Sequence, residues 1–129
     1  PDNNRVLFAS TQFDPQAQAK MDAENEFRAS GKSRRYSWDY DPTYELTLWN
    51  RADGSYQRLT DAEGYDAEGA ISPDGNYIVF ASNRRAYRGE LSPAEQRLFD
   101  VDASSAMDIY LMKLDGSDVT RLTDAVGYD

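Results

Sequence analysis

The feature that most constrains this chain is a set of short segments that occur twice in the same order. Three pairs of segments match: 1–10 with 73–82, 45–49 with 108–112, and 58–66 with 121–129. Self-similarity of this kind is typical of repeat architectures, in which each repeat is one supersecondary unit. The sequence therefore predicts two structural units of the same kind.

Strand and turn signals define the unit. Residues 6–10 and 77–82 are rich in β-branched and aromatic side chains, as buried strands are. Leu46 and Leu48 alternate with other residues, which is the period of a strand that buries one face. Asp-Gly pairs between the strands predict tight hairpins, because glycine adopts the positive φ that such turns need.

Four antiparallel strands per repeat are the blade of a β-propeller. With the strands named a to d from the innermost outward, the chain reads b, c, d and then a, b, c, d. We therefore expect an all-β fold of two propeller repeat units, 1–66 and 67–129. Short helical insertions are expected in the b–c connections, at about 14–41 in the first unit and about 84–106 in the second.

Both insertions carry helix signals. In the first, Asp14 can cap a helix, Pro15 suits its first turn and Gly31 suits its end. In the second, residues 92–95 have the Ser-x-x-Glu pattern of a capping box. Three apolar residues are expected to pack this second helix against its blade: Leu98, Phe99 and Val101.

Strand direction predicts where the insertions lie. Antiparallel order places the b–c and d–a connections at the same end of the sheets. Both insertions therefore share a face with residues 60–68 and 123–129. Because loops on a rigid scaffold commonly carry function, this face is the candidate functional face.

The amino-acid composition excludes most kinds of catalytic site from this chain. It has no histidine and no cysteine, so it lacks the commonest general base, a Ser-His-Asp arrangement, a thiolate nucleophile and a disulfide framework. No phosphate-binding glycine loop, Gly-x-Ser-x-Gly elbow or metalloprotease pattern occurs. We expect a protein that is not an enzyme, with no catalytic residue and no cofactor-binding residue.

The net charge of the chain limits the classes of partner that it is expected to bind. The formal net charge of −9 repels nucleic-acid phosphates and anionic membranes, so we expect no nucleic-acid partner. No apolar run reaches the roughly 20 residues that span a bilayer. Cationic partners and metal ions remain open.

Acidic residues crowd the d–a connection: Asp61, Glu63, Asp66 and Glu68, with Asp124 and Asp129 repeating part of the pattern. Connections of this type lead towards the central channel of a propeller, so the acids can form a negative mouth that attracts a cation or a basic partner. The alternative is that these carboxylates form turns and lie in solvent.

A second acidic stretch resembles the opening of a calcium-binding loop. Asp100, Asp102 and Ser104 supply oxygen ligands at alternate positions, and they are the candidate metal ligands of this chain. The loop lacks the glycine at its sixth position, where Ser105 stands, and the glutamate at its twelfth, which is Leu111. An ordinary structural loop is the alternative.

Aromatic and basic residues follow the first predicted helix: Arg34, Arg35, Tyr36, Trp38, Tyr40 and Tyr44. They can form a stacking platform for a sugar, a peptide or the side chains of a partner. Alternatively, the aromatic rings tie the insertion onto its sheet.

The strands of the repeat also resemble a known family. The segment 71–84, followed by 108–112, 115–117 and 121–123, resembles the repeat of TolB-like propellers. The resemblance covers the strands of both units and not the two insertions. It implies a six-bladed ring and favours a periplasmic or secreted bacterial protein. Because the same repeat occurs in binding proteins and in propellers attached to peptidases, it does not decide the function.

Two repeat units leave strand edges unpaired, and repeat architectures generally need three or more units. We therefore expect the remaining blades to be partners, supplied either by a longer parent chain or by homo-oligomerisation. The parent chain is the favoured source, because the sequence starts and stops inside a repeat.

The expected function is a non-catalytic binding or scaffold module that displays loops to a protein, a peptide or a cation. The alternatives are the accessory propeller of a larger enzyme, such as a serine peptidase, and a calcium-stabilised structural propeller.

Overall fold

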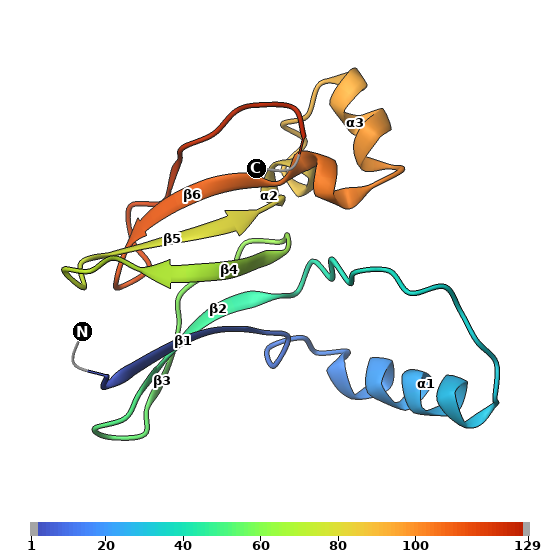
Figure 1. Ribbon diagram of the computed structural model, residues 1–129, viewed down its shortest axis with the longest axis horizontal. Coiled ribbons are helices and arrows are strands. Elements are labelled where there is room, and N and C mark those ends of the chain that lie inside the picture. The colour runs from blue at the N-terminus through green and yellow to red at the C-terminus, as the bar shows by residue number, and fades with distance from the viewer. Residues whose placement is uncertain (1–2, 128–129) are drawn as a thin grey trace.

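The repeated strand and turn signals produce repeated sheets. The computed structural model describes residues 3–127, and over these residues the chain forms two antiparallel sheets, as the sequence predicts (Figure 1). The first sheet has the strand order β1 (Arg5–Ser10), β2 (Glu45–Asn50), β3 (Tyr56–Arg58). The second sheet has the order β4 (Asp66–Ile71), β5 (Tyr77–Ser82), β6 (Asp108–Lys113), β7 (Thr120–Arg121).

The two sheets share one register, which confirms the repeat at the level of individual pairs. Ser10 lies opposite Glu45 in the first sheet, and Ser82 lies opposite Asp108 in the second. An equivalent threonine in each unit accepts a hydrogen bond from the backbone of a strand. The backbone N–H of Leu46 donates to Thr60 Oγ1 at 2.9 Å, and that of Ile109 donates to Thr123 Oγ1 at 2.9 Å. The matched segments of the sequence therefore occupy matched positions in space.

The core lies between the facing surfaces of the two sheets. Its buried apolar residues come from both units: Leu46, Leu48, Leu59, Ile78, Phe80, Tyr110 and Met112. Gly69 in β4 allows a close approach of the two sheets, because a Cβ at this position would lie 2.7 Å from Leu7 Cδ2 and 3.1 Å from Leu46 Cδ2. In Figure 1, β4 accordingly lies directly over β1 and β2.

Helix α1 (Ala17–Ala29) occupies the β1–β2 connection and extends beyond the end of the first sheet (Figure 1). Its start differs from the prediction. Gln16 is the N-cap residue and makes no side-chain cap, while Asp14 Oδ1 accepts the backbone N–H of Gln16 at 2.8 Å in the turn before the helix. The C-terminal exit agrees with the prediction, because Gly31 follows the C-cap residue with a φ of +69°.

The β5–β6 connection holds α2 (Arg84–Tyr87), α3 (Pro93–Phe99) and the 3-10 helix η1 (Ala103–Ala106). Ser92 and Glu95 form the predicted capping box at the start of α3. The expected apolar packing is wrong for Leu98 and Val101, which are 48% and 88% exposed. Phe99 packs edge-on to Tyr87 with the ring centres 5.8 Å apart. Among the helices of the described residues, none combines the length and the apolar character that crossing a membrane requires.

Candidate functional site

Both insertions leave the sheets at the same end, as the strand order predicts. The β1–β2 connection begins after Ser10 and ends before Glu45, and the β5–β6 connection begins after Ser82 and ends before Asp108. The β3–β4 connection returns to the same end, because Asp66 lies opposite Ser82. We call this end, formed by residues 11–44, 59–65 and 83–107, the insertion face.

Buried carboxylate–arginine pairs form the base of the insertion face. Three carboxylates each pair with an arginine: Glu45 with Arg58 at 2.8 Å, Asp66 with Arg84 at 2.6 Å, and Asp108 with Arg121 at 2.8 Å. Asp108 also pairs with Arg85 at 3.5 Å. The carboxylate residues are 3%, 0% and 1% exposed, respectively. Because a buried charge without its partner is strongly unfavourable, these pairs fix the strand ends from which the loops depart.

Asp66 has the most enclosed of these carboxylates. It accepts a hydrogen bond from Ser82 Oγ and one from Arg84 Nη2, and the Arg84 guanidinium lies 5.0 Å from the ring centres of Phe80 and Tyr110. Burial raises the pKa of Asp66 to about 6, against the opposing effect of the positive charge on Arg84. From the sequence, Asp66 was predicted to lie at the negatively charged mouth of the propeller channel. The structure instead places its side chain in the interior, where no partner can reach it.

The other predicted acids of this connection are exposed: Asp61, Glu63, Glu68 and Asp124. Glu68 belongs to strand β4, with a φ of +56°, so it does not lie in the loop with Asp61. Asp129 lies outside the described residues. Within residues 3–127, no group of three or more acidic side chains is arranged to hold a metal ion.

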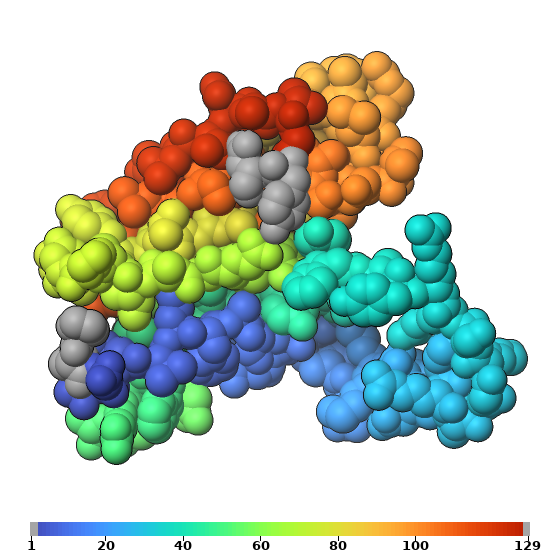
Figure 2. Space-filling view, in the orientation of Figure 1, coloured from blue at the N-terminus to red at the C-terminus, as the bar shows by residue number. Residues whose placement is uncertain are grey.

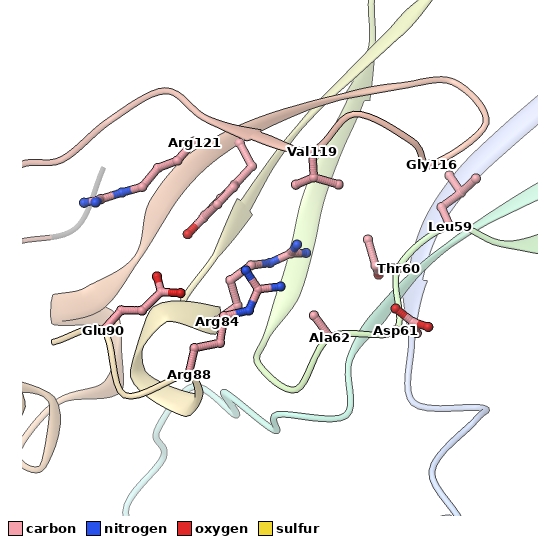
Figure 3. A pocket seen from close by; sticks show the side chains of 11 residues that line it. Leu59, Thr60, Asp61, Ala62, Arg84, Arg88, Glu90, Gly116, Val119 and Arg121 are labelled. Carbon is pink, nitrogen blue, oxygen red and sulfur yellow. The ribbon is translucent and has the colours of Figure 1, made fainter.

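A polar pocket of about 420 Å³ lies where the β3–β4 connection meets the second unit (Figure 3). Its lining comes from both units: Leu59, Thr60, Asp61, Ala62, Arg84, Arg88, Glu90, Tyr110, Gly116, Val119 and Arg121. In Figure 3, the side chains of Arg84 and Arg88 lie between Asp61 on one side and Glu90 on the other. Since Arg84 and Arg121 are held by Asp66 and Asp108, two of the three pocket arginines serve the ion pairs below it.

A larger hollow of about 940 Å³ brings two predicted sites together. It is lined by residues 35–38, Tyr40 and residues 101–104, so one wall belongs to the first insertion and the other to the second. Figure 2 shows it at the right of the molecule, between the cyan segment after α1 and the orange segment after α3. We call this hollow the groove.

The aromatic residues of the groove divide into anchors and exposed rings. Tyr65, which is 4% exposed, packs against Tyr40 and Tyr44 at ring distances of 5.2 and 5.3 Å. The Trp38 indole N–H donates to the Tyr65 hydroxyl at 3.1 Å. Trp38 itself is 56% exposed and Tyr36 is 82% exposed. Tyr40 and Tyr44 therefore tie the insertion to the sheet, whereas Tyr36 and Trp38 present their rings to solvent.

The two predicted arginines have different environments. Arg34 pairs with Glu24, and its guanidinium stacks over the Phe27 ring at 4.7 Å. Glu24 also pairs with Arg28 at 2.7 Å. Among the described residues, Arg35 has no ion pair, and its side chain lines the groove.

Two of the predicted calcium ligands, Asp102 and Ser104, line the opposite wall of the groove, and Asp100 does not. Asp102 Oδ1 accepts the backbone N–H of Ser104 at 2.9 Å and its hydroxyl at 2.7 Å, which caps η1. Asp100 accepts a hydrogen bond from Gln96 Nε2 at 2.8 Å along α3. These contacts give the carboxylates local structural roles, and calcium binding stays a prediction.

Several residues at the base of the insertion face were not singled out from the sequence. Glu45 and Asp108 recur in the repeat, and so do Arg58 and Arg121, so pairing across one register could have been inferred from that recurrence. Val101 was expected to pack against its blade, and no local pattern places an exposed valine across a groove from Trp38.

No protein-family model matches the sequence, and no curated protein matches it. Among solved structures, the chain is similar to a protein assigned as TolB from Agrobacterium tumefaciens, with 28% identity and a TM-score of 0.46. The similarity covers 64% of this chain and 23% of that chain, so this chain spans less than a quarter of the length of that protein.

Proposed function

We propose that this chain is a non-catalytic binding and scaffold module made of two blade units of a TolB-like β-propeller. Its first and second sheets are the blades, and the helices of the β1–β2 and β5–β6 connections are insertions displayed on one face. The ligand class is a protein, a peptide or a cation. A periplasmic or secreted location belongs to the same proposal.

The observation that carries this proposal is the contrast between the base and the loops of the insertion face. The strand ends are fixed by buried ion pairs, such as Asp66 with Arg84 at 2.6 Å. The connections above them are long and expose most of their side chains, and α1 has no buried residue. A rigid base with exposed loops is the arrangement by which many folds hold recognition residues in place.

The rest of the ring is the expected structural partner. Strand β1 is the edge of the first sheet, whereas its counterpart β5 lies between β4 and β6. An exposed edge strand can pair with another strand. We propose that a neighbouring blade, from a longer chain or from a second copy, supplies that strand.

Replacing residues 17–40 by a short glycine–serine turn tests the display role. We expect the variant to keep the β1–β2 pairing and the core, because the six register pairs from Arg5 with Asn50 to Ser10 with Glu45 do not involve the insertion. Amide hydrogen exchange in β2 and β6, compared with the parent chain, is the measurement. Loss of protection in both strands would show that the insertion holds the fold together and would contradict the proposal.

A further inference from the structure

We infer that copies of this chain associate head to tail, the second sheet of one copy packing its outer face against the outer face of the first sheet of the next copy. This inference rests on the proposed function and goes beyond it, because it names the two surfaces that meet between chains and the direction of the contact. The contact between the two sheets of a single chain is the template for it.

The two sheets of one chain pack through different faces. Two sets of buried apolar side chains meet between them, one from the first sheet and one from the second: Leu46, Leu48 and Leu59, and Ile78, Phe80, Tyr110 and Met112. In the repeat, Phe80 is equivalent to Phe8 and Leu48 is equivalent to Leu111. We call the face of either sheet that carries Phe8 or Phe80 its front face, and the face that carries Leu48 or Leu111 its back face. The contact inside the chain is therefore back to front, from the first sheet to the second.

The back face of the second sheet has the side chains of the first back face without their cover. Leu122 is equivalent to Leu59, and each donates its backbone N–H at 2.8 Å to the neighbouring strand. Leu59 is 8% exposed, whereas Leu122 is 54% exposed. Leu111 and Val79 lie opposite each other on this face, and both are partly exposed, although the equivalent Leu48 is buried.

The front face of the first sheet is open in the same way. Val6, Trp49 and Tyr56 lie opposite one another and form a row across the three strands. Val6 is 48% exposed, whereas its equivalent Ile78 is 0% exposed. Tyr56 is 64% exposed. Contiguous exposed apolar side chains of this kind mark an interaction surface more often than scattered ones do.

The two open faces are complementary by the standard of the buried contact. Leu59 and Val119 line the same pocket between the two units. Their equivalents in the repeat are Leu122 and Tyr56, so these two side chains would meet across two copies. Tyr56 is larger than Val119 and buries more apolar surface, which favours association.

The hairpins give a second point of correspondence. A Cβ at Gly116, in the β6–β7 hairpin, would lie 2.6 Å from the carbonyl oxygen of Leu59, so this hairpin packs tightly on the backbone of the first unit. Gly54 is the equivalent glycine of the β2–β3 hairpin, and within residues 3–127 no atom lies within 4 Å of a Cβ built there. In the inferred contact, the uncovered β2–β3 hairpin packs on the backbone at Leu122 of the other copy.

The arrangement of the sheets sets the symmetry and the strength of the association. Because the sheets are stacked (Figure 1), the two open faces lie on opposite sides of the stack, and one surface of each copy meets a different surface of the next. Strand β4 packs on β1 and β2 inside the chain, and the first sheet has no such fourth strand over residues 3–127. The contact between copies is therefore smaller than the contact inside the chain, and we expect it to depend on protein concentration.

Sedimentation equilibrium with two variants and their mixture tests the inference. Leu122→Glu places a charge on the back face, and Tyr56→Glu places one on the front face. Each variant alone should raise the Kd of self-association at least about tenfold, because burying an unpaired charge is strongly unfavourable. Their equimolar mixture should form a one-to-one dimer and nothing larger, because only the back face of Tyr56→Glu and the front face of Leu122→Glu remain unmodified.

Leu98→Glu is the matched control. Leu98 lies in α3, outside both faces, and is 48% exposed against 54% for Leu122. The same substitution there should leave the Kd of self-association within about twofold of the parent value. Far-UV circular dichroism checks the fold of each variant, and Leu122→Ser or Tyr56→Ser replaces a glutamate variant that loses the spectrum of the parent.

Three outcomes would overturn the inference. A mixture that stays monomeric while the parent associates would indicate an isologous contact, in which both copies use the same surface. Association unaffected by Leu122→Glu would indicate pairing through the backbone of β1 alone, and it would leave the edge partner of the proposed function standing. A parent chain that is monomeric at every concentration would also overturn it, while the loop-replacement variant still decides the display role independently.

Discussion

At the scale of single residues, the decisive feature is the burial of three carboxylates, each with an arginine. Glu45 and Asp108 occupy equivalent positions at the start of β2 and β6, and Asp66 begins β4. A buried ion pair contributes less to stability than its geometry suggests, because both charges lose their hydration. Removing one partner is costly, however, since the other charge then remains buried alone. The pairs therefore fix the positions of the strand ends.

Arg84→Met tests the cost of removing one partner from the most deeply buried ion pair, Asp66 with Arg84. We expect it to lower the free energy of unfolding by about 3 to 5 kcal/mol, because Asp66 would remain buried without its cation. Arg58→Met should cost clearly less, since the Arg58 side chain is 39% exposed and that of Arg84 is 3% exposed. Urea unfolding of both variants is the measurement. Equal losses would mean that burial of the pair does not set the cost.

The charge state of Asp66 predicts a pH dependence of stability. Its pKa in the folded chain is about 6, above the ordinary value of 3.8, so the folded chain binds this proton more tightly than the unfolded chain does. The contribution of Asp66 to stability is then fully present below about pH 4 and is lost as the pH rises through about 6. We expect the difference in free energy of unfolding between the parent and Asp66→Asn to shrink over that interval. A difference that grew with pH would show that Arg84 lowers this pKa instead.

At the scale of elements, the two units differ most where connections cross from one unit to the other. The β3–β4 connection packs directly against α2, and a Cβ at Gly64 would lie 2.7 Å from Arg84 Cα. The repeat provides an internal comparison, because Gly127 is the equivalent glycine. Gly127 has a similar backbone, with φ of +136° against +139°, and among residues 3–127 no atom lies within 4 Å of a Cβ built there. The contact with α2, rather than the turn itself, distinguishes the two positions.

Gly64→Ala and Gly127→Ala form a matched pair for this contact. Both variants incur the strain of a positive φ, so their difference isolates the clash with the Arg84 backbone. We expect Gly64→Ala to cost about 1 to 3 kcal/mol more than Gly127→Ala, which is the range for overpacking. Thermal unfolding of the two variants measures the difference. Equal costs would place the whole effect in the backbone conformation.

At the scale of the whole molecule, two sheets packed face to face leave their outer surfaces and edges for other contacts. Val6 in the edge strand β1 is 48% exposed, and Val79 in β5 is 37% exposed. Strand edges and half-covered apolar positions of this kind are normally covered by neighbouring repeats. The proposed propeller therefore predicts association of the isolated chain.

Light scattering over a range of protein concentrations tests this prediction. We expect the average mass to rise above that of one chain, because copies can pair along β1 and cover the outer face of the first sheet. A trimer is the state that would close a six-bladed ring of two-unit chains. A compact monomer that stays stable at every concentration would count against both sources of the remaining blades.

The features that could be predicted correctly from the sequence are those that depend on residues close together in the chain. The strands, the Asp-Gly hairpins and the capping box at Ser92 were predictable, because each depends on residues a few positions apart and most occur twice. The start of α1 was misplaced, since Asp14 satisfies the turn before the helix instead of the first helical turn. The packing of Leu98 and Val101 was also misjudged, because which side of a short helix is buried depends on what lies next to it.

By itself, the sequence determined the two units, their strand order and the end from which the insertions leave. These follow from periodicity, turn chemistry and the repeat, which are properties of neighbouring residues. Only the tertiary structure decided that Asp66 is an interior ion-pair residue and that residues 35–38, Tyr40 and residues 101–104 line one groove. Those contacts join segments far apart in the chain, and they form only when packing of the sheets brings opposite charges and exposed rings within reach.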